Sequence, residues 1–307
     1  MAGSSSGRWI SRAVSPRFDT ERASVERRLE EICARYLSGL PTGIADAIRY
    51  GLNSPGKRIR PVLLLYAYRA VGGSGDATLL ACGPEIIHAY SLVHDDLPCM
   101  DDDDMRRGRP TVHKVYGSRT ATIAGVAMIP VAAMVVRDAA RSMGLPSEIS
   151  GTLLRILLEA GGVSGMIGGQ SRDLAGEGLA LSLAEREAIH RAKTGALIVA
   201  SLAIGALAGG GSPLQVTAVE RYGRAVGLAF QIMDDVLDVT STSTTLGKTT
   251  GRDVALGKSS FPALLGVAGA RARAQDLIHD GLHALAEQKL LTQELSEVAN
   301  FMVTRTS

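Results

Sequence analysis

The sequence predicts an all-α fold, and three observations point to packed helices. Apolar residues make up 46% of the 307 residues but aromatic residues only 4%, so the core must consist of aliphatic and small side chains, which are typical of helices. Apolar residues recur at helical spacing almost throughout, as in Leu29, Ile32, Cys33 and Tyr36. No segment shows convincing strand alternation. We therefore expect helices of roughly 12 to 25 residues in a bundle-like arrangement.

Turn-forming residues mark where these helices should end. Breaks fall at 40–43, 54–56, 72–75, 98, 108–110, 145–146, 209–213 and 241–257. Two uncharged stretches, 120–136 and 194–219, come near the ~20 apolar residues that a membrane span requires. Pro130 interrupts the first stretch and a triple glycine interrupts the second, so we expect buried core helices and no membrane span.

The chain shows no internal repeat and no linker, so residues 21–307 are expected to form a single helical domain. Residues 1–20 are expected to be a disordered tail, although their arginines and serines are also typical of transit peptides. The net charge of +2 gives no sign of nucleic-acid binding. Cys33, Cys82 and Cys99 lack any CxxC spacing, which indicates neither disulfides nor zinc and fits a cytoplasmic protein.

Six acids lie within ten residues at a predicted helix end. They are Asp95, Asp96, Asp101, Asp102, Asp103 and Asp104. Pro98 should force the helix to end there. Carboxylates this dense repel one another unless cations neutralise them, and Mg²⁺ is the usual partner where phosphates complete its shell. Acidic runs are more often solvated surface, but the apolar Leu97 and Met100 within this run argue against that interpretation.

A second acidic group lies in an otherwise apolar helix. It comprises Asp234, Asp235 and Asp238. Asp234 and Asp238 are four residues apart and Gln231 precedes Asp234 by three, so these polar groups share one helix face. One such pattern is common by chance and is also compatible with ordinary surface acids near a helix end. Two clusters, each ending an apolar helix, favour a clamp that holds one diphosphate through bridging metals.

Diphosphate recognition also needs fixed cations, and three basic sets are suited to it. They are Lys57 with Arg60, Arg106 with Arg107, and Lys193-Thr194 together with Lys248 and Lys258. Arginine grips phosphate oxygens in pairs, and lysine acts as a point charge. Each set alone would usually be a solvated face, so their conjunction is what indicates an anion site. His88 lies two turns before Asp95 and could also donate to a diphosphate, although a lone helical histidine is more often a core residue.

The glycine-rich segment 161–170 and the Gly-Lys pairs at 247 and 257 do not have the spacing of a phosphate-binding loop. A P-loop is therefore excluded.

Together these motifs resemble the trans-polyprenyl diphosphate synthase family, especially bacterial-type farnesyl and geranylgeranyl diphosphate synthases. The resemblance rests on segments 56–61, 87–96, 106–107, 169–170, 190–195 and 230–262, and it extends from about Arg28 to the C-terminus. It implies the isoprenoid synthase fold, with antiparallel helices around a deep central cavity, usually as a homodimer. It also implies an Mg²⁺-dependent prenyltransferase that condenses isopentenyl diphosphate head to tail with dimethylallyl, geranyl or farnesyl diphosphate.

The resemblance also implies a role for each matching residue. Three Mg²⁺ ions, for which Mn²⁺ can substitute, would be held by Asp95, Asp96, Asp101, Asp234, Asp235 and Asp238. Isopentenyl diphosphate would be bound by Lys57, Arg60, His88 and Arg107. The allylic diphosphate would be bound by Arg106, Lys193, Thr194, Gln231, Lys248 and Lys258. Gln170 and Asp173 would be supporting residues.

The length of the product is expected to depend on the helix that bears Asp95, where each turn of ~5.4 Å matches about one isoprene unit. Ser91 lies one turn below Asp95. Tyr90, five positions before the first aspartate, resembles the cavity floor of farnesyl synthases, while the insert 97–100 is also common in geranylgeranyl synthases. We expect farnesyl diphosphate (C15), with geranylgeranyl diphosphate (C20) as the next choice.

Two other functions use similar motifs. A class I terpene cyclase would also ionise an allylic diphosphate, but it would have no use for Lys57, Arg60 and His88 as an isopentenyl diphosphate site. A regulatory subunit of a heteromeric synthase would have eroded aspartates, whereas both clusters are intact.

Overall fold

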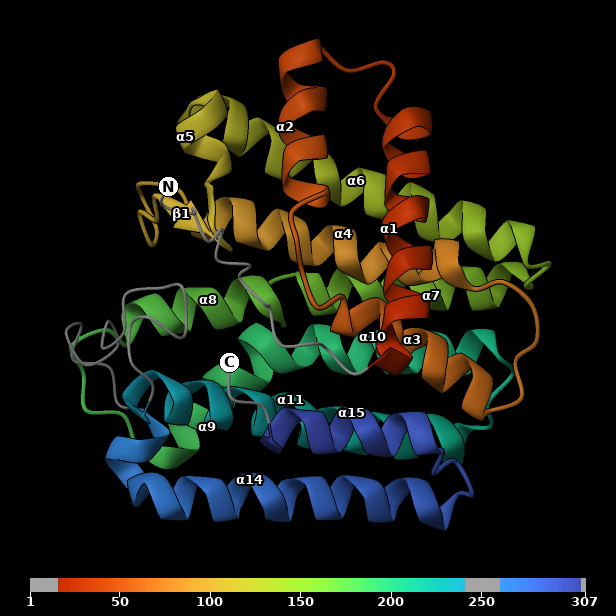
Figure 1. Cartoon of the computed structure of the whole chain (residues 1–307). Helices are drawn as coiled ribbons and strands as arrows, with labels where there is room; N and C mark the ends of the chain where they lie inside the picture. The colour runs from red at the N-terminus through yellow and green to blue at the C-terminus, as the bar shows by residue number, and fades with distance from the viewer. Residues whose placement is uncertain (1–15, 241–259, 305–307) are drawn as a thin grey trace, which may run out of the picture.

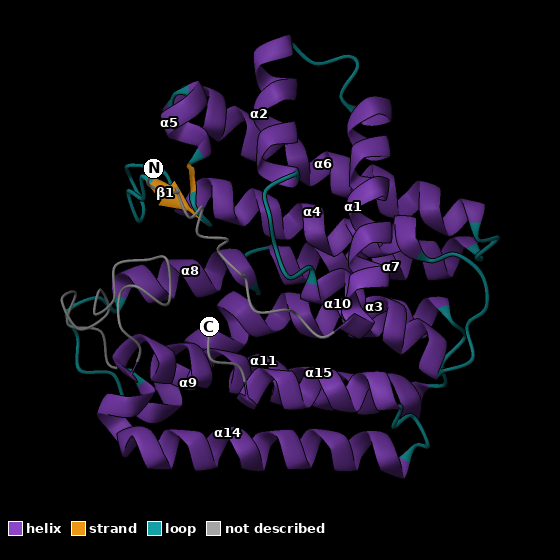
Figure 2. Ribbon diagram, viewed as in Figure 1, coloured by secondary structure: helices purple, strands orange, loops and turns teal. Residues whose placement is uncertain are grey.

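The computed structural model of the chain describes residues 16–240 and 260–304, and nearly all of these residues are helical (Figure 2). The helices up to Asp95 are α1 (Pro16–Tyr36), α2 (Thr42–Leu52), α3 (Ile59–Ala70) and α4 (Thr78–Asp95). They are followed by β1 (Met105–Arg106), β2 (Arg109–Pro110), α5 (Val112–Tyr116), α6 (Ser118–Ser142), α7 (Ser147–Gly161), α8 (Met166–Ala175) and α9 (Leu183–His190). The remaining elements are the π-helix η1 (Arg191–Gly195), α10 (Ala196–Ala208), α11 (Pro213–Thr240), α14 (Phe261–Glu287) and α15 (Gln293–Thr304).

The long helices α4, α6, α10, α11 and α14 run alongside one another, whereas α1 and α2 cross them steeply (Figure 1). The direction of the chain reverses from α10 to α11 and again from α11 to α14, so neighbouring helices are antiparallel. This arrangement confirms the predicted all-α fold. The ends of α4 and α11 that carry the aspartates lie on the same side of the bundle, the left side in Figure 1.

Two apolar groups form the core. The first lies among α1, α2, α4, α6 and α7 and includes the buried Leu29, Ile48 and Val135. The second lies among α3, α10, α11, α14 and α15, where the hydroxyl of the fully buried Tyr222 donates to the backbone oxygen of Leu295 at 2.7 Å. Each buried aliphatic side chain contributes roughly 1.5–3 kcal/mol through removal from water.

Helix α1 begins earlier than expected. The helix starts at Pro16, and Phe18 is fully buried, with its ring 6.3 Å from that of Tyr66 and 6.1 Å from that of Phe301. Residues 16–20, which were assigned to the disordered tail, therefore belong to the folded part. Residues 1–15 lie outside the described residues.

Two segments, Ser118–Ser142 and Leu183–Ala208, are long and apolar enough to cross a membrane. Both are core helices of the bundle, since α6 packs on α4 and α10 packs on α3 and α11. Pro130 does not interrupt α6, which was wrongly expected to break there; the proline is exposed and the helix continues through it. The triple glycine does end α10, at Ala208.

Candidate active site

Asp95 is the last residue of α4, and the chain turns back on itself directly after it. As expected from Pro98, the helix ends here, and the amide of Asp101 donates to the backbone oxygen of Asp95 at 2.9 Å. Burial raises the pKa of Asp95 to about 6; Lys193 and Arg106 oppose the shift, and Asp101 and Asp96 add to it. The structure thus brings three predicted acids and two predicted cations into one electrostatic group.

A β-hairpin with a two-residue turn places Arg106 next to the acids that follow α4. Strands β1 and β2 pair Arg106 with Arg109, and the turn between them consists of Arg107 and Gly108, both with positive φ (53° and 77°). Paired positive φ values are typical of the tight type I′ turn. Nε and a terminal nitrogen of Arg106 donate to Oδ1 of Asp96 at 2.7 and 2.6 Å. The hairpin was not predicted, although an Arg-Gly pair between short segments resembles the signal of such a turn.

A second cationic group surrounds His88 on α4. Burial and the charges of Arg60, Arg107, Arg106 and Arg58 lower the pKa of His88 well below its usual 6.5, so its imidazole is neutral at pH 7. Burial also lowers the pKa of Arg60 to about 10, with Glu85 opposing the shift. Nε of Arg60 is buried and has no hydrogen-bond partner in the structure. A guanidinium with unmet hydrogen bonds beside other cations is suited to binding an anion.

Lys193 lies on the π-helix η1, a local widening that is frequent at functional sites. Its ammonium donates to Oδ2 of Asp173 at 2.6 Å, and Arg186 donates to Oδ1 of the same carboxylate at 3.1 Å. Helix α8 approaches η1 closely, because a side chain at Gly169 would place its Cβ 2.3 Å from the amide nitrogen of Lys193. The supporting role expected for Asp173 is therefore matched by a direct contact, whereas Arg186 was not predicted.

On α11, Gln231 accepts a hydrogen bond from the hydroxyl of Thr194 at 3.3 Å, which links this helix to η1. Asp234 and Asp238 are half-buried on the same helix. Asp235 is 3% exposed, and its Oδ2 accepts the amide of Phe261 at 3.0 Å, at the start of α14. This hydrogen bond links α11 to the start of α14 through one oxygen of Asp235, and the metal ligation expected of Asp235 stays a prediction. Lys248 and Lys258 lie outside the described residues.

The donor set fits a hard divalent cation, since carboxylate oxygens are the ligands that Mg²⁺ prefers. Burial is the main cause of the raised pKa of Asp95, and the charges of Asp101 and Asp96 add to it, so a cation bound here would favour the ionised form. Gln170 supports the same conclusion. Its side chain is 7% exposed, and neither polar atom of its amide has a hydrogen-bond partner in the structure. Such an amide can bind water or a ligand oxygen.

Tyr90 and Ser91 lie one turn below the acids. Tyr90 is 5% exposed, and its ring meets His94 edge-on at 5.2 Å. The hydroxyl of Ser91 donates to the backbone oxygen of His88 at 2.9 Å. Their expected role in setting the length of the product stays a prediction.

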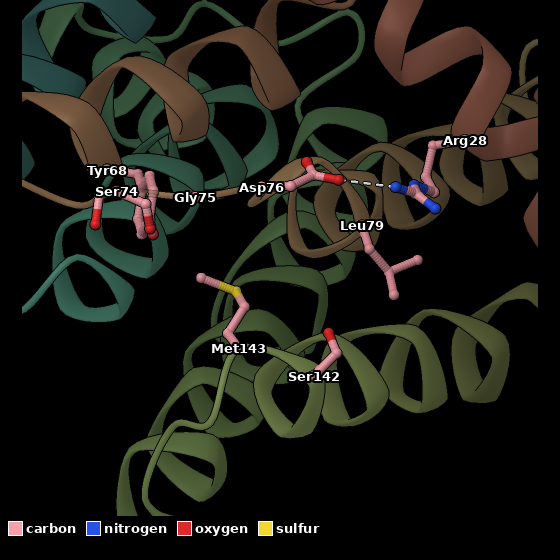
Figure 3. Close-up of a pocket in the computed structure, with 8 residues that line it drawn as sticks. All are labelled: Arg28, Tyr68, Ser74, Gly75, Asp76, Leu79, Ser142 and Met143. Carbon is pink, nitrogen blue, oxygen red and sulfur yellow. Dashed lines mark hydrogen bonds and ion pairs between the residues drawn. The ribbon is translucent and has the colours of Figure 1, made fainter.

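A further cluster of possible metal ligands and two surface hollows lie apart from the site described above. Asp102, Asp104 and His113 offer potential metal ligands within 4.8 Å of one another, but Lys114 already neutralises Asp104 at 2.7 Å. Two surface hollows have volumes of about 490 and 450 Å³, and none of the described site residues lines either one. The larger hollow is bordered by the Arg28–Asp76 ion pair (Figure 3).

Comparisons with known proteins agree with this geometry. The family model for polyprenyl synthetases matches residues 41–297. The chain belongs to the polyprenyl synthetase family. It is 42% identical to the farnesyl diphosphate synthase of Escherichia coli K12, over 94% of this chain and 99% of that protein. It is also 42% identical to a chloroplastic geranylgeranyl pyrophosphate synthase of Capsicum annuum, over 85% and 70% of the two chains.

Solved structures show the same fold. An FPP/GFPP synthase from Zymomonas mobilis superposes with a TM-score of 0.82 at 30% identity, covering 94% of this chain and all of that one. A geranyltransferase from Helicobacter pylori, solved with magnesium and isoprenyl diphosphate, has a TM-score of 0.78 at 33% identity, with 95% and 97% coverage. These relatives confirm the predicted family, the isoprenoid synthase fold and a metal-dependent prenyltransferase that elongates prenyl chains. They do not favour a terpene cyclase or a regulatory subunit.

Proposed function

We propose that the chain condenses isopentenyl diphosphate with dimethylallyl or geranyl diphosphate and that farnesyl diphosphate is its main product. The observation that carries this proposal is the presence of two separate groups suited to a diphosphate: the arginines around His88, and the acids around Asp95 together with Lys193 and Arg106. An enzyme that joins two diphosphates needs two anion sites, whereas a cyclase needs only one. Turnover of geranyl diphosphate without isopentenyl diphosphate would contradict the proposal.

The two sites take different substrates in this proposal. Isopentenyl diphosphate binds to Lys57, Arg60, His88 and Arg107. The allylic diphosphate binds to Arg106, Lys193, Thr194 and Gln231, with Lys248 and Lys258 retained from the sequence prediction. Three Mg²⁺ ions, or Mn²⁺, bind to Asp95, Asp96, Asp101, Asp234, Asp235 and Asp238. Asp235 also holds the start of α14 through the hydrogen bond from Phe261 to one of its oxygens.

The reaction begins when the allylic C–O bond breaks and its electron pair leaves with the diphosphate. Bound Mg²⁺ neutralises the charge that develops on this leaving group. Lys193, held in place by Asp173, and Arg106 stabilise the same charge by hydrogen bonding. The double bond of isopentenyl diphosphate then attacks the allylic cation to form the new C–C bond. The departing diphosphate accepts the proton that is finally lost, so no side-chain base is needed.

The proposed product length depends on Tyr90, whose ring is buried one turn below Asp95. In this proposal the ring limits the growing chain to fifteen carbons. The full-length similarity to a farnesyl diphosphate synthase supports this choice. The test is chromatography of the product against C10, C15 and C20 standards. A predominant C20 product would contradict it.

We also propose a cytoplasmic homodimer. Large apolar side chains are exposed on three successive helices: Ile123 and Val126 on α6, Leu158 on α7 and Ile167 on α8. We propose that they form the interface, since apolar surface that is not scattered singly commonly marks one. Light scattering should give a mass in solution of twice the chain mass. The substitution Val126→Lys should lower this mass, because it places a charge in the proposed interface. The three free thiols, of Cys33, Cys82 and Cys99, suit a reducing compartment.

A further inference from the structure

Arg58 combines two unfavourable properties. Its φ of 49° is in the left-handed region, which non-glycine residues rarely adopt, and its side chain is only 4% exposed. A buried charge and a strained backbone each persist only where other contacts offset their cost. The position of Arg58, between Lys57 and Arg60, suggests what those contacts are for.

The guanidinium of Arg58 joins three parts of the fold. One terminal nitrogen donates to Oε1 of Glu85 on α4 at 2.7 Å. The other donates to the backbone oxygens of Leu52 and Ser54, both at 2.8 Å. Leu52 is the last residue of α2, where helix carbonyls lack partners within the helix. Arg58 thus ties the end of α2 and the following loop to the middle of α4.

The loop held in this way carries the cations of the isopentenyl diphosphate site. Lys57 lies on the loop, and Arg60 lies in the first turn of α3. Arg107 reaches the same loop by donating to the backbone oxygen of Pro55 at 2.7 Å. The approach is close enough that a Cβ at Gly56 would lie 2.5 Å from the Arg107 guanidinium.

Glu85 is the acidic member of this arrangement. It is 2% exposed, and it lies three residues before His88 on the same face of α4. Its charge favours the protonated forms of Arg60 and Arg107 against the effect of burial. A single carboxylate therefore holds Arg58 by contact and offsets the mutual repulsion of the neighbouring cations.

We propose that Arg58 and Glu85 are a positioning pair that holds the loop 53–57, and with it Lys57, Arg60 and Arg107, in the geometry that binds isopentenyl diphosphate. This inference depends on the site proposed above. Neither side chain is exposed enough to touch substrate, so the pair acts through the residues that do. In the allylic diphosphate site, Lys193 is held by Asp173 and Arg106 by Asp96, so the main supports of that site lie outside this brace.

The test is steady-state kinetics of the full chain with each substrate varied while the other is saturating. Arg58→Ala and Glu85→Ala should raise KM for isopentenyl diphosphate about tenfold or more and leave KM for geranyl diphosphate within about threefold. Free guanidinium should partly restore the Arg58→Ala variant, because it can fill the space left by the side chain. Glu85→Gln keeps the hydrogen-bond acceptor and should have a smaller effect than Glu85→Ala.

The direction of the change separates positioning from simple charge. If Glu85 only repelled the anionic substrate, its removal would lower KM for isopentenyl diphosphate, and that result would overturn the inference. If the variants raise both KM values and lower kcat to a similar extent, the pair is a general structural contact, and that result would also overturn the inference. The isosteric Glu85→Gln keeps the test decisive if the alanine variants do not fold.

Two controls complete the design. Glu21→Gln breaks another short ion pair of a buried glutamate, with Arg69 at 2.6 Å, and should leave both KM values unchanged. Arg60→Lys tests the site itself, because lysine loses the guanidinium fork. If Arg60→Lys has no effect on KM for isopentenyl diphosphate, the proposed site is wrong. If it has an effect and the Arg58 and Glu85 variants have none, only the positioning pair is wrong.

Discussion

Replacing Asp95 with asparagine should stabilise the folded chain even though it removes a proposed metal ligand. Burial raises the pKa of Asp95 from 3.8 to about 6, so in the absence of metal its ionised form destabilises the native state at neutral pH. A shift of about two units corresponds to about 3 kcal/mol, at ~1.4 kcal/mol per unit. Asparagine has the shape of the protonated acid and no charge, so it avoids this cost.

The stability gained by the Asp95→Asn variant should increase with pH. The native state binds the Asp95 proton more tightly than the unfolded chain, so its contribution to stability is fully present below pH 3.8 and lost as pH rises through about 6. The Asp95→Asn variant should therefore have a higher free energy of unfolding than the wild type at pH 7.5 and the same free energy near pH 4. With ~2.1 cal/mol/K of unfolding entropy per residue, 3 kcal/mol corresponds to about 5 °C in melting temperature.

The assay is thermal unfolding followed by circular dichroism, with chelator present, at both pH values. Asp104→Asn is the matched control, because Asp104 is exposed and paired with Lys114 and its replacement should give no gain. Equal melting temperatures of the Asp95→Asn variant and the wild type at pH 7.5 would refute the reasoning. So would a gain that is as large at pH 4.

Three further predictions concern the reaction. Asp234→Ala should lower turnover by orders of magnitude, measured by incorporation of labelled isopentenyl diphosphate, because one wall of the clamp is lost; near-normal turnover would contradict the clamp. Tyr90→Ala should give longer products by chromatography, and an unchanged product spectrum would remove Tyr90 from that role. Binding of isopentenyl diphosphate should be accompanied by proton uptake below neutral pH, because the anion raises the depressed pKa of His88. Calorimetry in two buffers with different ionisation enthalpies measures this uptake, and His88→Gln should abolish it.

Much of the fold followed from local patterns. The spacing of apolar residues predicted the helices because each helix buries one face against its neighbours. Pro98 predicted the end of α4, and the triple glycine predicted the end of α10. The expected break at Pro130 failed because an exposed proline can remain within a long helix whose other face is packed. The start of α1 was missed because the burial of Phe18 depends on Tyr66 and Phe301, which are distant in sequence.

The site was predicted in its residue types but not in its connections. Acids and cations could be identified from their density near helix ends. The contact of Arg106 with Asp96, the bond of Asp235 to α14, and the sharing of Asp173 by Lys193 and Arg186 all join residues that only tertiary packing brings together. The π-helix that carries Lys193 was also missed, because one extra residue in a helical turn leaves the apolar spacing nearly unchanged.

Strained backbone conformations occur at and beside the proposed site. In the described part of the chain, four non-glycine residues have positive φ: Arg58, Asp102, Arg107 and Lys289. Arg107 belongs to the proposed isopentenyl diphosphate site, Arg58 braces it, and Asp102 follows a proposed metal ligand. The hairpin turn requires the positive φ of Arg107, whereas the contact with the distant Glu85 helps to hold Arg58 in its left-handed conformation. Such strain cannot be read from a sequence, yet it fixes the cations before substrate arrives, and pre-organised charge is what an anion site requires.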